Sequence, residues 1–194
     1  MGTIKANGVY QKDQLAFDTS VVTLVNSLSA QVDKLRSLAL YMPLGNPGFA
    51  INTNFDVKNA NAISYINGGT IKTLSANTNF DTGTSAVIAS SKYGVAVLSV
   101  NSSGTAVVTW FTASGAGYAS EALAIAAITA PAATDTVLGY VTVQAHASGF
   151  TAGTDALTTG TGGNVATATT YYNLINPNAL LLNSAVASTL SLSV

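Results

Sequence analysis

At 194 residues, the chain is long enough for one domain with a real hydrophobic core and an extension. Charged residues make up 8% of it, against roughly 25% in an average soluble protein, and the formal net charge is -1. The scattered cations, none of them after Lys92, disfavour nucleic-acid binding, and the lack of cysteine excludes disulfides and thiolate metal sites. We therefore expect that much of the protein's surface packs against copies of the chain or against a larger assembly, because buried charges would cost desolvation energy there.

The N-terminal part of the chain is its most charged region. Seven charged residues lie within the first 36 positions, which is nearly half of the total. Met1 to Val9 lacks the charged segment and apolar run of a secretory signal, and the sequence has no apolar stretch of 18 residues. We therefore expect synthesis in a cytoplasm and no membrane anchor. Gly2, Asn7 and Gly8 favour an extended arm from Met1 to Phe17.

A helix is expected next, because Asp18, Thr19 and Ser20 offer N-cap oxygens ahead of an apolar periodicity. Apolar residues then recur at alternating steps of four and three over about three heptads, which is the spacing of a coiled coil. These residues are Val21, Val25, Leu28, Val32 and Leu35. Flanking residues such as Leu24 and Leu38 widen the apolar face, which favours either a trimer or packing onto the chain's own β-rich body. The sequence leaves both alternatives open.

The predicted helix must end before Pro43, because proline lacks the N–H that a helix needs. The prolines and glycines between Pro43 and Gly48 are typical of a rigid joint between modules. We therefore expect an N-terminal arm, helix and joint at residues 1–48, which anchor and oligomerise the protein. A β-rich body follows at 49–178, and a C-terminal strand or tail at 179–194.

Beyond the joint, short runs of alternating apolar and polar residues are separated by turn residues. The clearest runs are Gly94 to Asn101, Thr105 to Thr112 and Thr136 to Ala145. Between them, the Ala-rich segment from Ala119 to Ile128 predicts one short helix. The expected fold class is mainly β: an N-terminal arm and α-helix, with a possible trimeric coiled coil, followed by an antiparallel β-sandwich or barrel.

The sharpest catalytic hypothesis concerns Asp81, whose Phe-Asp-Thr-Gly-Thr-Ser surroundings resemble those of the catalytic carboxylate in aspartic proteases. That chemistry requires two aspartates that share a proton. The sequence Asn52 to Asp56 does recur as Asn77 to Asp81, but Asp56 is followed by Val-Lys instead of Thr-Gly. We therefore favour one turn geometry used twice, with an aspartic-type hydrolase as an alternative.

The other candidates for chemistry are isolated in the sequence. His146 is the single histidine, so a Ser-His-Asp set would require it, and a turn residue at a strand end is the simpler interpretation. Asp135 and Asp155 lie among Thr and Gly, but no spacing typical of a calcium loop recurs, so no metal or cofactor is expected. Aromatic residues could line a sugar-binding groove, but such residues in strands are more often core or interface. They are Trp110, Phe111, Tyr118, Tyr171 and Tyr172.

From Asn59 onward, the order of several short sequences resembles a group of tailed-bacteriophage virion proteins. These sequences include Lys58 to Gly68, Ile128 to Pro131, Leu138 to Val141 and Phe150 to Thr154. The resemblance spans roughly residues 50 to 175, and the first 45 residues do not match it. It implies a non-enzymatic β-domain that projects from the virion, commonly as a homotrimer, with an N-terminal segment that anchors it.

We therefore expect a capsid decoration protein in the virion, a trimer that docks on the major capsid protein or other virion proteins. Bridging of neighbouring capsid subunits would stabilise the head shell, because bound protein favours the state that binds it. The main alternative is a tail-fibre or head-fibre module that binds host surface glycans through exposed aromatic residues. In either case we expect no binding to nucleic acid or to a membrane, and no enzymatic activity.

Overall fold

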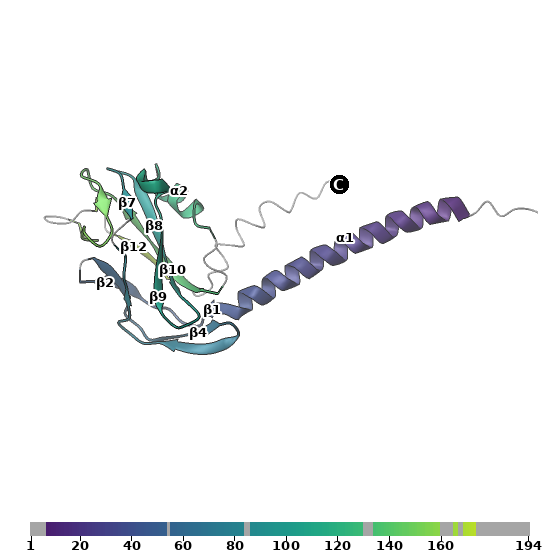
Figure 1. Cartoon of the computed structure of the whole chain (residues 1–194), viewed down its shortest axis with the longest axis horizontal. Helices are drawn as coiled ribbons and strands as arrows, with labels where there is room; N and C mark the ends of the chain where they lie inside the picture. The colour runs from purple at the N-terminus through teal and green to yellow at the C-terminus, as the bar shows by residue number, and fades with distance from the viewer. Residues whose placement is uncertain are drawn as a thin grey trace, which may run out of the picture. The chain divides into compact units, whose positions relative to one another are not determined.

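The computed structural model describes residues 7–53, 55–83, 86–129, 134–159, 165–166 and 169–173. In its first helix, the side chains described are those of residues 19–33, 36, 39 and 40. The chain forms two compact units, Met1–Ala39 and Leu40–Val194, and Figure 1 labels most of their elements.

The described residues of the first unit form one long helix, α1, Asn7–Leu40, whose last residue belongs to the second unit. The predicted extended arm is wrong from Asn7 onward, because the residues after Gly8 are mostly good helix formers and no proline precedes Pro43. The predicted N-cap residues lie inside the helix. There the Thr23 Oγ1 hydroxyl donates a hydrogen bond to the carbonyl oxygen of Thr19 at 2.8 Å, which is how threonine is accommodated within a helix.

The second unit is mainly β, as predicted, and its strands pair in antiparallel fashion. The largest sheet has the strand order β12-β10-β8-β9. Its strands are β8 Tyr93–Val100, β9 Ala106–Phe111, β10 Thr136–Gln144 and β12 Thr170–Asn173. The first three coincide closely with the clearest runs in the sequence, because their Val-rich stretches favour extended backbone.

Three smaller sheets are also formed by the described part of the body, in the orders β1-β4-β5, β2-β3-β6 and β11-β7. The strands of the first are β1 Tyr41–Pro43, β4 Ile63–Asn67 and β5 Thr70–Leu74. Those of the second are β2 Phe49–Asn52, β3 Asp56–Asn59 and β6 Asn79–Phe80. The third consists of β7 Val87–Ile88 and β11 Phe150–Thr151.

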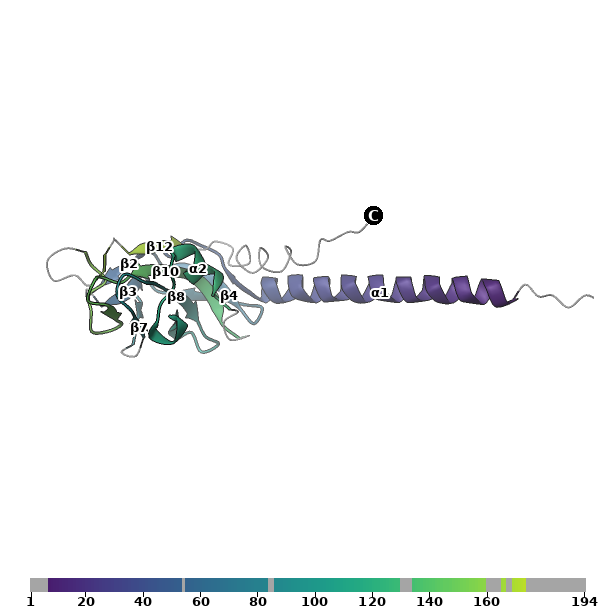
Figure 2. The same cartoon turned by 90° about the horizontal axis from the view of Figure 1, so that it is seen from above.

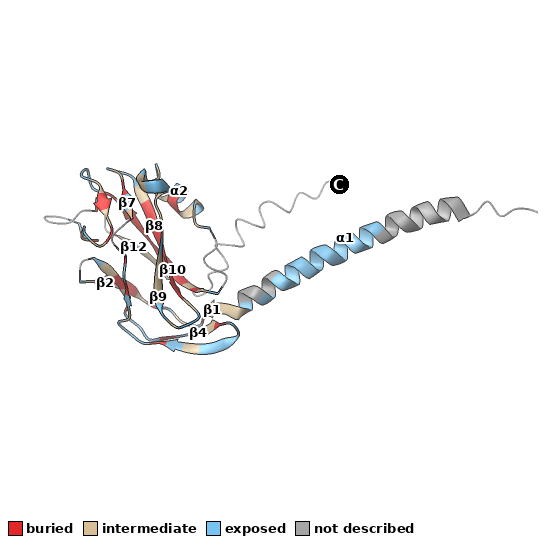
Figure 3. Ribbon diagram, in the orientation of Figure 1, coloured by how far each residue is buried: buried red, intermediate tan, exposed pale blue. Residues whose placement is uncertain are grey.

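The main core lies between the largest sheet and the smaller ones. Each smaller sheet contributes a fully buried aromatic ring, namely Tyr65, Phe80 and Phe150, and these join Leu98 and Leu138 of the largest sheet. Burial of such side chains contributes roughly 1.5–3 kcal/mol each. Figure 3 shows buried residues along β8 and β10.

A second apolar cluster covers the opposite face of the largest sheet. Alternate residues of β8 therefore have different partners: Ala96 and Leu98 face the main core, whereas Val95 and Val97 face the second cluster. Both faces of β8 are buried, which explains why its sequence is mostly apolar. The short helix α2, Glu121–Ala126, packs on this second face against β8 and β10, as Figure 2 shows.

Helix α2 confirms the short helix predicted between the strands. Its N-cap is Ser120, whose side chain accepts a hydrogen bond from the backbone N–H of Leu123 at 3.3 Å. Ala124 is its fully buried residue. A 3-10 helix, η1, Ala113–Gly115, lies between β9 and α2 in the sequence.

The proline and glycine segment predicted as a joint is part of the body. Pro43 is buried at the end of β1, and the backbone N–H of Leu44 donates to the Ser64 carbonyl oxygen at 2.9 Å. The two units divide earlier, between Ala39 and Leu40, so a strand of the body follows α1 directly. The predicted C-terminal strand at residues 179–194 lies outside the described residues.

Candidate assembly interface

Apolar side chains are exposed along one side of α1. At about 100° per residue, Val21, Val25, Leu28 and Val32 fall within an arc of roughly 60°. Their exposed fractions are 40%, 56%, 59% and 48%. The side chain of Leu35, the last residue of the predicted heptad pattern, lies outside the described set. Four of the five predicted assembly residues therefore form an exposed apolar stripe, which we call the α1 seam.

The α1 seam is widened by its neighbours. Val22 is 57% exposed and Leu24 is 69% exposed, and they flank the seam on opposite sides. Every residue from Thr19 to Asp33 is exposed, as the pale blue of α1 in Figure 3 shows. A helix with an apolar stripe normally buries it, because packing of that stripe supplies most of the helix's stability.

Three aromatic residues considered for glycan binding are used in the cores. The Trp110 indole N–H donates to the Thr82 carbonyl oxygen at 2.9 Å, and its ring lies 5.9 Å from that of Phe150. Phe111 and Tyr118 are partly buried against the second apolar cluster. These rings therefore stabilise the body.

The remaining two aromatic candidates lie on β12. The Tyr172 ring stacks on Tyr140 with centroids 4.5 Å apart. Its hydroxyl donates to Glu121 Oε1 at 2.9 Å, and Thr142 Oγ1 donates to the same oxygen at 2.5 Å, which ties α2 to the sheet. Burial, together with Glu121, raises the pKa values of Tyr172 and Tyr140. Tyr171 packs against the main core, where burial raises its pKa to about 12.

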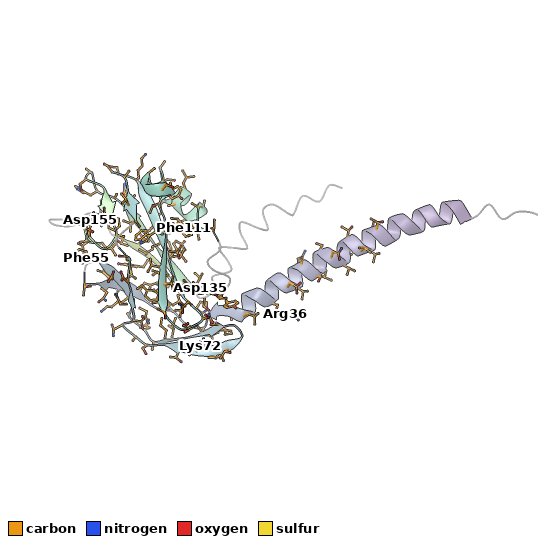
Figure 4. All side chains as sticks on the ribbon, in the orientation of Figure 1. Arg36, Phe55, Lys72, Phe111, Asp135 and Asp155 are labelled. Carbon is orange, nitrogen blue, oxygen red and sulfur yellow. The ribbon has the colours of Figure 1, made fainter. Side chains whose placement is uncertain are left out.

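Asp81 is exposed, and its Oδ1 accepts a hydrogen bond from the Gly83 N–H at 2.8 Å. The prediction that one turn geometry is used twice is wrong. The two copies of the five-residue sequence do not share one geometry. In the first copy Thr53 has positive φ, at 50°, whereas in the second it is Asn77, at 60°. Figure 4 labels Phe55, which is 40% exposed, whereas the matching phenylalanine of the second copy is fully buried.

The two copies instead bond to each other. Asn52 Nδ2 donates to Asn79 Oδ1 at 2.6 Å, and Asn79 Nδ2 donates to Asp56 Oδ2 at 2.9 Å. Asp56 Oδ1 also accepts the backbone N–H of Thr82 at 3.0 Å. The sequence did not lead us to expect that Asp56 anchors the two copies to each other. The recurrence of Asn and Asp in both copies was the one signal that pointed to such a contact.

The other candidates for catalysis or metal binding lie apart. His146 is exposed beside a turn. Asp135 Oδ2 accepts a hydrogen bond from Ser99 Oγ at 3.3 Å, and Asp155 Oδ2 accepts one from the Thr151 N–H at 2.7 Å. Figure 4 shows that these two aspartates lie at separate places on the body. Among the residues the structure describes, no three His, Asp or Glu side chains gather in a group that could hold a metal ion.

No family model, no curated protein and no solved structure matches the chain. In the described ranges, no helix combines the length and apolarity needed to cross a membrane. The exposed α1 seam is therefore the feature from which a function can be argued.

Proposed function

We propose that the protein is a non-enzymatic structural component of a tailed-phage virion, a capsid decoration protein that binds and stabilises the head shell as a homotrimer. The observation that carries this proposal is the α1 seam, an apolar stripe with heptad spacing that is exposed over its described length. A stripe of that spacing can pack against the same stripe on other copies of the chain. In a coiled coil each apolar side chain of one helix fits into a gap between side chains of the next helix, and the heptad spacing repeats this fit along the helices. In this proposal α1 forms a trimeric coiled coil, and the sheets of the body form a β-sandwich.

The choice of three chains follows from the residues beside the seam. Val at a positions and Leu at d positions suit a two-stranded coiled coil. However, Val22 and Leu24 occupy the flanking e and g positions and are more than half exposed. Two helices would leave these flanks in water, whereas three helices bury a wider face of each. The flanks therefore favour a trimer.

The sparse charge of the body fits attachment to a large shell. The body holds eight of the charged residues, and no cation follows Lys92. Contact with capsid subunits would then bury few unpaired charges, each of which costs desolvation energy. Three linked bodies would bind the shell more tightly than one, because each binding event raises the effective concentration for the next. Such bridging would stabilise the shell by mass action.

The alternative function, a fibre module that binds host glycans, requires an exposed aromatic platform. Trp110 and Tyr118 are packed in the cores of the body, and the Tyr172 hydroxyl is bonded to Glu121. These contacts favour decoration of the shell over glycan binding.

Two measurements test the proposal. Light scattering of the purified full chain at micromolar concentration should give three times the mass of the chain, and a stable monomer would contradict the trimer. Immunogold labelling of intact particles with antibodies against the chain should mark the heads. Labelling confined to tails would support the fibre alternative, and unlabelled virions would overturn the proposal.

A further inference from the structure

The outer face of the β1-β4-β5 sheet carries a second apolar surface, apart from the α1 seam. In the strand register, Met42 faces Ile66 and Ile66 faces Ile71, so one apolar row crosses all three strands. Ile71 is 68% exposed. The adjacent row faces inward, where Pro43 and Tyr65 are buried. Figure 3 accordingly draws the β4–β5 hairpin largely in the colour of exposed residues.

This outer face bears no charge among the residues that form it. Ser64 and Thr73 form the next exposed pair along the strands, and Leu44, whose N–H bonds to the Ser64 carbonyl oxygen, is 45% exposed. The nearest charged residue in the strands is Lys72, which Figure 4 labels. It pairs with Tyr65 in the inward row, and its Nζ donates to the Ser102 carbonyl oxygen at 2.6 Å.

The direct connection between α1 and β1 is a reason to expect that a second copy of the chain covers this face. Strand β1 begins at Tyr41, directly after α1 ends at Leu40, with no linker between them. When α1 helices associate, the β1 strands of the copies must therefore start at the same end of the bundle, at high effective concentration.

The missing charge fits the same partner. Near the axis of a symmetric homo-oligomer, each side chain approaches its own copies, so a charge there would repel itself. An apolar and uncharged face avoids that repulsion. We infer that Met42, Leu44, Ile66 and Ile71 form a second contact surface between copies of the chain, an inference that depends on the proposed trimer. This contact would fix the bodies to the end of the helix bundle.

Single-cysteine cross-linking tests the proximity of the copies. Because the chain has no cysteine, a Met42→Cys variant carries one thiol per chain. Under mild oxidation at dilute concentration, it should form disulfide-linked dimers at least tenfold faster than Leu123→Cys. The control residue is 53% exposed on α2, away from the outer face of β1-β4-β5.

An Ile71→Lys variant tests the contribution to binding. It places a like charge on every copy at the outer face, and dissociation of the trimer should be at least tenfold faster than in wild type. Val87→Lys, at a 44% exposed position of β7, should leave the rate unchanged.

The outcomes separate this inference from the proposed function. A wild-type trimer in which Met42→Cys cross-links no faster than Leu123→Cys, with an unchanged dissociation rate for Ile71→Lys, would overturn the inference alone. A monomeric wild-type chain would overturn the proposed trimer and the inference with it.

Discussion

The α1 seam predicts a measurable effect for a single truncation, Leu28→Ala. Leu28 is the most exposed of the seam residues described, at 59%, and lies near the middle of the seam. Alanine is an even better helix former than leucine, so the substitution leaves the intrinsic stability of α1 intact. Its effect should therefore appear in association alone.

The magnitude follows from the apolar surface removed. Leu→Ala deletes about three carbon groups, each contributing roughly 0.8 kcal/mol on burial. Because 59% of the side chain is exposed in the single chain, association gains about 1.4 kcal/mol per Leu28, or about 4 kcal/mol for three copies. That loss corresponds to roughly a 10³-fold weaker three-chain association constant. The midpoint concentration varies as the square root of this constant, so it should rise about 30-fold.

Sedimentation equilibrium over a range of concentrations measures this midpoint, with circular dichroism to check that α1 stays helical. Thr23→Ala is the matched control, because Thr23 lies on the opposite side of the helix and bonds to its own backbone at Thr19. Equal midpoints for Leu28→Ala and wild type would refute the reasoning, as would an equal shift for both variants.

Three further predictions concern the body. Asp56→Ala removes hydrogen bonds to a charged group and should lower the free energy of unfolding in urea by about 2–4 kcal/mol, whereas Asp81→Ala, at an exposed position, should change it little. Gly139→Ala should destabilise the β12 pairing by ~3 kcal/mol or more, visible as faster hydrogen exchange there, because a Cβ would collide with the Tyr172 carbonyl oxygen. The pKa of Tyr171 rises to about 12 in the fold but stays near its ordinary value of 10.0 when unfolded. Stability present below pH ~10 should therefore decline as the pH rises toward 12, and Tyr171→Phe should reduce that decline by ~1 kcal/mol after allowance for solvent exposure of the ring.

Elements with a strong local pattern could be predicted from the sequence. Strands β8 and β10 are rich in Val, and α2 combines an N-cap serine with an Ala-rich segment before a proline. For these elements, local preference and tertiary packing agree.

Boundaries that depend on the surroundings could not be predicted. Asp18, Thr19 and Ser20 would cap a helix if the preceding chain were extended, but the same residues are accommodated inside a longer helix. Pro43 likewise indicates that a helix has ended, but it does not indicate whether a joint or a strand comes next. It closes β1, an edge strand of its sheet, where the missing N–H of proline is tolerated.

The two proposed contact surfaces show how far sequence reasoning extends toward a site. The periodicity that identifies the α1 seam would be the same for a helix packed on its own core, and the structure adds that the described side chains of the seam are exposed on the helix. The outer face of β1-β4-β5 could not be identified even as a candidate, because Met42, Ile66 and Ile71 become neighbours only through the strand register. The residues of a candidate contact surface can thus be named from the sequence where one element carries them, whereas a candidate surface shared by several strands needs the fold.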